Sequence, residues 1–274
     1  MNIYFLTLLF ITQTIFGQIP KVAHNDSVWQ QLEIKNFEMS EYFEHYLYED
    51  FIFFFEKNLI NDHKEFFHIV DWNLDGIDDL IYSGPGSTDS KQTIIYEGRD
   101  GKLIKKLDVF GEIINFTLTG IGSPYGFVMY HTPFDPPDIL RNIETYIPIC
   151  ADSGYSFKLD SKICFIEFTN FPDVFNIQKP FVVANNGYRL RMQPLIDDET
   201  VFFHFGKGNT IAIYESGSRG IALAEKTDHT GRTWWFVLML NNLPFRSDYF
   251  DNIGNPANEF FCYGWMSSRF LITE

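Results

Sequence analysis

The stretch from Glu65 to Ser83 reads Glu-Phe-Phe-His-Ile-Val-Asp-Trp-Asn-Leu-Asp-Gly-Ile-Asp-Asp-Leu-Ile-Tyr-Ser and largely decides the fold. Two short apolar runs, 65–70 and 79–83, flank a loop in which acidic side chains, an Asn and a Gly alternate with other residues. Short runs of Phe, Ile and Val bounded by Asp, Asn and Gly are typical of strands joined by a turn. The sequence therefore predicts two strands here, connected by a polar loop.

The β-pattern continues after this pair. Further strands are predicted at 93–97, 103–109, 113–118, 125–130, 155–159 and 163–168, and Arg99-Asp100-Gly101 is typical of a hairpin turn. Phe and Tyr are abundant (30 and 14 residues), and aromatic side chains fit half-buried strands. One exception precedes them, because the aromatic residues of 41–59 recur at helical spacing after Ser40, a suitable N-cap. The predicted fold is mainly β, with an α+β N-terminal region that holds one helix.

The loop between the first two strands carries the ligand pattern of a hard cation. Its candidate oxygen donors are the side chains of Asp71, Asn73, Asp75 and Asp79 and the backbone carbonyl of Ile77. Calcium takes six to eight oxygens, and Gly76 allows the sharp turn that wraps such a loop. A helix–loop–helix calcium hand is excluded, because its twelfth position is Tyr82 rather than a carboxylate. The loop therefore predicts a calcium site, and an acidic turn without an ion is the alternative.

This loop resembles the calcium loop of FG-GAP and VCBS-type repeats, whose pattern is Asp-x-Asp/Asn-x-Asp-Gly-x-x-Asp. Asp71, Asn73, Asp75, Gly76 and Asp79 match that pattern in order. Such repeats form the blades of integrin-like propellers, but the match covers one hairpin and no second copy follows it. The resemblance implies a calcium ion that fastens a loop, not a propeller.

The C-terminal part of the chain shows a second pattern. Its landmarks are Tyr188-Arg-Leu-Arg-Met-Gln-Pro194, Gly206-Lys-Gly208, Thr233-Trp-Trp-Phe-Val237 and Gly264-Trp-Met-Ser-Ser-Arg-Phe-Leu271. Short aromatic and β-branched strands separated by Gly-rich turns suit a small closed barrel. The segment resembles the bacterial SH3 (SH3b) domain, with matches at Arg191, Pro194, Gly208, Trp235, Val237, Gly264, Trp265 and Leu271. A small SH3-like β-barrel is therefore expected over residues 182–274.

The SH3b resemblance implies a binding module, because domains of that family mostly bind cell-wall peptides or other short peptides. Trp234, Tyr249, Tyr263 and Trp265 are the candidate ligand-binding residues, as aromatic side chains that can line an apolar cleft. The alternative is that they belong to the core, since strand alternation buries one of each Trp pair. We expect Trp235 to be buried and Trp234 to be the more exposed. The long insertion 241–260 departs from the family pattern.

Composition and the first residues indicate an exported protein. The net charge of −15 disfavours nucleic acid as a partner, because the phosphate backbone is also negative. Residues 1–17 are apolar and end in a small residue, which predicts a signal peptide, with a buried first strand or helix as the alternative. No later stretch is long and apolar enough to be an integral membrane segment. We expect a secreted or periplasmic protein, in agreement with the calcium loop.

The three Cys leave two readings open. In an oxidising compartment Cys150 and Cys164 can form a disulfide and leave Cys262 free, or all three are buried thiols.

No catalytic residues are predicted, because no HExxH, GxSxG or Cys–His signature occurs. The expected domains are a signal peptide at 1–17, a calcium-loop-containing β-rich domain at 18–175 and the SH3b-like barrel at 182–274. The expected function is that of an exported, non-catalytic binding protein stabilised by calcium, whose partner is a peptide or cell-wall fragment. The alternative is an envelope hydrolase, or an inhibitor of one, with a dispersed site.

Overall fold

The computed structural model describes residues 29, 65–86, 90–118, 123–131, 140–151, 154–202, 206–240, 245–246 and 261–274. The predicted signal peptide at 1–17 and the predicted helix at 41–59 lie outside these residues. Within them the chain is mainly β, as the sequence predicted. No helix in these ranges is long and apolar enough to cross a membrane.

The chain divides into two units, which are described separately. Of the described residues, the N-terminal unit holds Trp29, those between 65 and 131, and 143–161. The C-terminal unit holds 140–142 and 162–274, with the gaps given above. The two longest strands, β7 (Leu140–Ala151) and β8 (Gly154–Ile166), contribute residues to both units.

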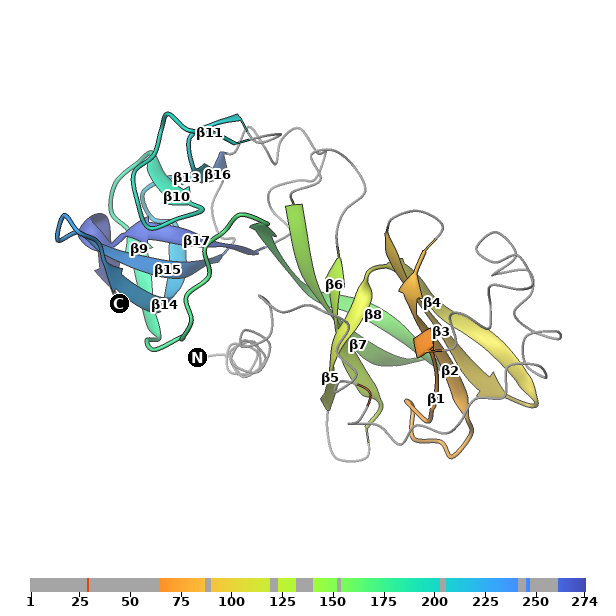
Figure 1. The fold of residues 1–274 in the computed structure, drawn as a ribbon. Coiled ribbons are helices and arrows are strands. Elements are labelled where there is room, and N and C mark those ends of the chain that lie inside the picture. The colour runs from red at the N-terminus through yellow and green to blue at the C-terminus, as the bar shows by residue number, and fades with distance from the viewer. Residues whose placement is uncertain are drawn as a thin grey trace. The chain divides into compact units, whose positions relative to one another are not determined.

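A four-stranded antiparallel sheet in the N-terminal unit carries the predicted loop (Figure 1). Its strands are β1 (Phe67–Val70), β2 (Asp79–Pro85), β3 (Lys91–Arg99) and β4 (Lys102–Phe110), paired in that order. Val70 pairs with Asp79, which confirms the predicted strand pair around residues 71–78. The predicted hairpin turn is also confirmed, because Asp100 and Gly101 have φ of 51° and 72° and connect β3 to β4. Two consecutive positive φ values suit the twist of the flanking strands.

The rest of the N-terminal unit is built on β5 (Glu112–Leu118), β6 (Tyr125–His131) and the inner parts of β7 and β8. The predicted strands at 113–118 and 125–130 are therefore confirmed. The two strands predicted at 155–159 and 163–168 form one strand, β8. The core of this unit includes Trp72, Ile95 and Phe127, each of which is at most 1% exposed.

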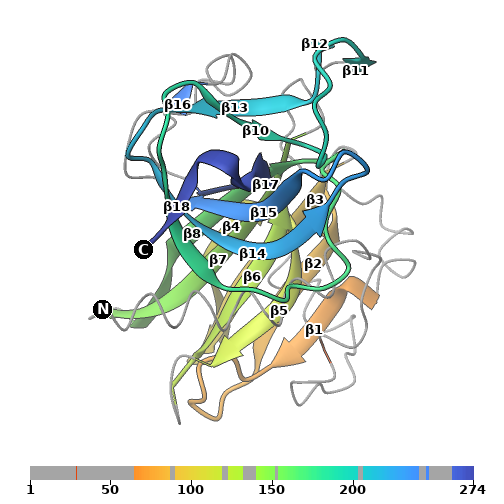
Figure 2. The same cartoon turned by 90° about the vertical axis from the view of Figure 1, so that its left-hand side faces the viewer.

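The C-terminal unit contains most of the remaining strands. They are β9 (Lys179–Val183), β10 (Tyr188–Arg191), β11 (Val201–Phe202), β12 (Gly206–Lys207), β13 (Thr210–Tyr214), β14 (Arg219–Thr227), β15 (Thr233–Leu240), β16 (Phe245–Arg246), β17 (Phe261–Ser267) and β18 (Leu271–Thr273), with a short 3-10 helix, η4 (Ser268–Phe270), before β18. Hydrogen bonding runs β18-β9-β14-β15-β17, and β10 pairs with both β17 and β13. Figures 1 and 2 show β14, β15 and β17 side by side.

The expected closed barrel is not shown, because the sheets of the described strands are open. One reason is that β17 also pairs in parallel with β8, through Phe261 and Cys262, so the sheet continues past β17. Side chains from strands at both ends of the sheet nevertheless share one core, which includes Phe181 of β9 and Tyr214 of β13. The sheet of this unit therefore curves around a common interior.

The central strand β15 is buried on both faces. Trp235, Val237 and Met239 point into the core that the curved sheet surrounds. On the opposite face Phe236 is fully buried and packs against Phe171, with ring centroids 5.1 Å apart. The strand-free segment 170–178 covers this second face of β15. The sequence of β15 is therefore a continuous apolar run and does not alternate between apolar and polar residues.

Candidate functional site

The side-chain oxygens of the loop at 71–78 bind backbone amides of the loop itself. The carboxylate of Asp71 accepts hydrogen bonds from the N–H groups of Asp75 and Gly76, at 3.0 and 2.9 Å. The Asn73 amide oxygen accepts a second bond from the Asp75 N–H, also at 3.0 Å. Asp75 in turn accepts one from the Ile77 N–H at 2.8 Å. These bonds fold the loop tightly and leave each oxygen one lone pair for another partner.

Asp79, at the end of the loop, is turned into the sheet. Its side chain accepts hydrogen bonds from the N–H of Trp72 at 3.1 Å and the N–H of Gly98 at 2.8 Å. It is 1% exposed, and burial raises its pKa to about 7, although these two bonds act in the opposite direction. The negative charges of Asp75 and Asp71 raise the pKa further. Asp79 therefore fastens the loop to β3.

The loop contains the oxygen donors that a calcium site needs, but their side chains do not converge on one point. Its oxygen donors are those that calcium prefers, and Asp71 and Asp75 have no cationic partner within the described residues. However, these residues contain no group of three or more His, Cys, Asp or Glu side chains positioned to hold one metal ion. The Asp79 carboxylate is directed towards the N–H groups of Trp72 and Gly98, which it binds. The predicted ligand set, including the Ile77 carbonyl, therefore stays a prediction.

The four predicted ligand-binding residues have different positions. Tyr249 lies outside the described residues. Tyr263 and Trp265 are 0% and 2% exposed, so their rings pack in the interior. Trp234 is also buried, and the expectation that it is more exposed than Trp235 is wrong, since the values are 1% and 7%. The cause is the double-sided burial of β15.

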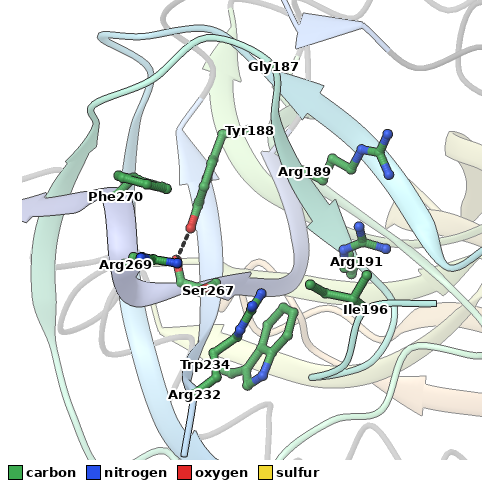
Figure 3. Close-up of a pocket in the computed structure, with 10 residues that line it drawn as sticks. All are labelled: Gly187, Tyr188, Arg189, Arg191, Ile196, Arg232, Trp234, Ser267, Arg269 and Phe270. Carbon is green, nitrogen blue, oxygen red and sulfur yellow. Dashed lines mark hydrogen bonds between the residues drawn. The ribbon is translucent and has the colours of Figure 1, made fainter. Parts of the chain in front are cut away.

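Trp234 nevertheless borders a pocket in the C-terminal unit, with a volume of about 220 Å³ (Figure 3). The lining residues are Gly187, Tyr188, Arg189, Arg191, Ile196, Arg232, Trp234, Ser267, Arg269 and Phe270. They come from β10, the loop after it, the end of the turn before β15, and the junction of β17 with η4. Cross-strand pairing brings these segments together, because Trp234 pairs with Ser267. The pocket is thus built from residues far apart in the sequence.

Arg191 forms the rigid side of the pocket. A register shift between Leu190 and Arg191 buries both residues, against the usual alternation of a strand. The Arg191 guanidinium donates to Asp198 at 2.9 Å and to the Asn209 amide oxygen at 2.7 Å. The bond from Arg191 lowers the pKa of Asp198, which also accepts from Arg189 at 2.8 Å. One carboxylate therefore serves two arginines.

Arg232 and Arg269 are held differently. Each guanidinium lies over an aromatic ring, Arg232 at 5.7 Å from the Trp234 centroid and Arg269 at 5.6 Å from that of Phe270. Neither has a carboxylate partner in the described part of the chain. In Figure 3 the Arg232 side chain extends along Trp234 into the space below Tyr188. Stacking on a ring positions both positive charges without neutralising them.

The N–H of Trp234 and the hydroxyl of Tyr188 are already used. Trp234 Nε1 donates to Asp228 at 2.9 Å. A hydrogen bond from the Thr230 hydroxyl, together with the one from Trp234, lowers the pKa of Asp228. Tyr188 donates its hydroxyl hydrogen to the backbone carbonyl of Ser267 (Figure 3). Both aromatic residues therefore offer ring surface to the pocket, and Asp228 is ionised at any physiological pH.

The pocket is cationic in a chain with a net charge of −15. Four arginines line it, whereas three carboxylates, of Asp197, Asp198 and Asp228, interact with lining residues, which leaves the lining positive. The ten lining residues include no carboxylate, imidazole or thiol side chain. Such a lining is suited to holding a ligand that accepts hydrogen bonds, because it presents donors and aromatic faces.

Sequence reasoning singled out Trp234 and missed the arginines. Arg189 and Arg191 occur close together in β10, but Arg232 and Arg269 are isolated in the sequence and follow no motif. Comparison of the chain with known protein families, with curated proteins and with solved structures gives no match.

Proposed function

We propose that this chain is an exported, non-catalytic binding protein whose C-terminal unit holds a peptide or a cell-wall fragment. The observation that carries the proposal is the pocket in which four arginines surround three aromatic rings. Arginine and aromatic residues are the side chains that contribute most to binding at protein surfaces. The SH3b-like sequence pattern of the same segment supports a peptide ligand.

Binding is favoured over the hydrolase alternative by the chemistry of the pocket. Hydrolysis by general acid–base catalysis needs titratable groups with suitable pKa values within hydrogen-bond reach of the substrate. The described lining supplies only guanidinium groups, a phenol and a hydroxyl. Guanidinium groups do not exchange protons at physiological pH, so their role here is to attract and orient.

Calcium enters the proposal as a structural brace of the loop at 71–79. The donor chemistry of the loop and the uncompensated charges of Asp71 and Asp75 support it. Export, to the periplasm or the medium, is supported by the apolar segment 1–17 and by the high calcium level outside the cytoplasm. The brace belongs to the N-terminal unit, so its loss is expected to affect stability rather than ligand choice.

The test is sedimentation of the full-length protein, without its signal peptide, with purified bacterial cell walls. We expect retention above that of an unrelated acidic protein, and a loss of about 10-fold or more in the double variant Arg232→Gln, Arg269→Gln. Arg219→Gln is the matched control, because Arg219 is an exposed arginine of the same unit that pairs with Glu274 outside the pocket. Retention no better than that of the unrelated protein, or equal losses in control and double variant, would contradict the proposal.

A further inference from the structure

The unused polar groups of the pocket are hydrogen-bond donors. Arg232 and Arg269 have no acceptor on a carboxylate in the described part of the chain. The hydroxyl of Ser267 is buried, with the residue 9% exposed, and it has no hydrogen-bond partner there either. That oxygen has no accessible surface on the pocket, so the donors open to a ligand are the two guanidinium groups. Arg232 is half-buried and Arg269 is exposed, so water solvates both when the pocket is empty, and both guanidinium groups are available to an acceptor that enters it.

The other polar groups of the pocket already have hydrogen-bond partners within the protein. Arg189 and Arg191 share the carboxylate of Asp198, the Trp234 N–H is taken by Asp228, and the Tyr188 hydroxyl hydrogen is taken by the Ser267 carbonyl. Arg232 and Arg269 therefore keep donors without a carboxylate partner, and the lining keeps a net positive charge. These donors suit an anion with at least two acceptor oxygens, to which a guanidinium group binds well.

The volume of the cavity favours the end of a polymer chain as the ligand over a whole small molecule. Its volume of about 220 Å³ is below the roughly 300–1,000 Å³ of pockets that enclose a whole small ligand. At its edge Phe270 and Ile196 are 41% and 55% exposed, which leaves apolar surface for a neighbouring side chain. An extended anionic polymer is disfavoured, because the chain as a whole carries −15 and would repel its remaining charges.

We infer that the pocket seats the free C-terminal carboxylate of a peptide. The carboxylate oxygens accept hydrogen bonds from Arg232 and Arg269, and the last side chain of the peptide lies against Phe270 and Ile196. Capture of a terminal carboxylate is an established mode of peptide recognition, since it reads the end of a chain independently of most of its sequence. This inference rests on the proposed function and specifies its ligand.

The experiment compares two peptide pools with the full-length protein. Both pools are N-acetylated hexapeptides randomised at the last two positions, one with a free C-terminal carboxylate and one with a C-terminal amide. Retention on the immobilised protein is expected to be about 10- to 100-fold stronger for the free acids. In Arg232→Gln and Arg269→Gln this preference should shrink, and in the control Arg219→Gln it should persist. Near-identical unfolding curves show that the variants are folded.

The outcomes separate the inference from the proposed function. Equal retention of acids and amides, together with binding to cell walls, would overturn the carboxylate inference and leave the binding function standing. Displacement of cell-wall fragments by millimolar inorganic phosphate, but not by the peptide acids, would also overturn the carboxylate inference and leave the binding function standing. If neither pool nor cell walls are retained, the binding function itself is wrong. A preference for free acids that depends on Arg232 and Arg269 supports both.

Discussion

The buried carboxyl group of Asp79 is expected to make the folded chain less stable as the pH rises from about 4 to about 7. In the unfolded chain its pKa is near the ordinary value of 3.8, whereas burial raises it to about 7 in the folded chain. Between these values the folded state holds a proton that the unfolded state releases, so the free energy of unfolding falls with rising pH. The stabilising contribution is complete below about pH 4 and is lost as the pH rises through about 7.

The size of this effect follows from the two pKa values. Each pH unit between them corresponds to about 1.4 kcal/mol, so the span from 3.8 to about 7 gives a loss of up to about 4 kcal/mol. The assay is urea unfolding followed by tryptophan fluorescence at pH 4.5 to 8. EDTA is present throughout, so that no divalent cation neutralises the loop.

Asp79→Asn is the matched variant, because an amide does not ionise. It loses one of the two hydrogen bonds from Trp72 and Gly98, which costs about 1–3 kcal/mol at every pH. The informative quantity is the difference in unfolding free energy between wild type and variant. We expect wild type to lose a few kcal/mol relative to the variant between pH 4.5 and 7.5. Parallel curves over this range would refute the argument that burial of Asp79 controls the pH dependence.

Three further predictions concern the loop and the core. Addition of about 1 mM calcium should raise the Tm of the wild type but not of Asp75→Ala, as measured by scanning calorimetry, and a wild type that does not respond rules out the brace. Phe236→Ala should lower the free energy of unfolding by about 3–5 kcal/mol in urea, because the ring is fully buried among aromatic neighbours, and a loss below about 1 kcal/mol contradicts that packing. Gly98→Ala should destabilise the chain more than Gly101→Ala, since a Cβ at Gly98 collides with the backbone oxygen of Asp78, whereas at Gly101 it meets no atom and costs only the strain of the positive φ; equal losses in urea unfolding would show that the loop does not pack on β3.

The sequence predicted those parts of the fold that local chemistry determines. The Asp100-Gly101 turn could be recognised because few residues tolerate two positive φ values. β7 was missed, because its polar residues Asn142, Glu144 and Thr145 interrupt any apolar pattern, yet all three are buried. Their burial depends on partners elsewhere in the chain, as when Cys164 donates to Asn142 at 3.0 Å. No local pattern encodes such partners.

The pocket was beyond sequence reasoning for the same reason. Arg232 and Arg269 line the same pocket only because β15 pairs with β17, a contact between segments about 30 residues apart in the chain. The exposure of Trp234 was misjudged because its strand was expected to have one face in solvent. Phe171 and Phe175, in the strand-free segment 170–178, pack on β15 and cover that face. The alternation of side chains along β15 was predicted correctly, but tertiary packing buries both faces of the strand.

The three cysteines give the protein a native labelling site. Cys150 is exposed, whereas Cys164 and Cys262 are buried, and burial raises the pKa of Cys262 to about 12. A thiol must be ionised to react, so a maleimide reagent at neutral pH should modify Cys150 far faster than the two interior thiols. A single fluorophore can therefore be attached within β7 of the wild-type chain. Its anisotropy would rise when the labelled protein binds a cell-wall fragment, because the large fragment slows the tumbling of the complex.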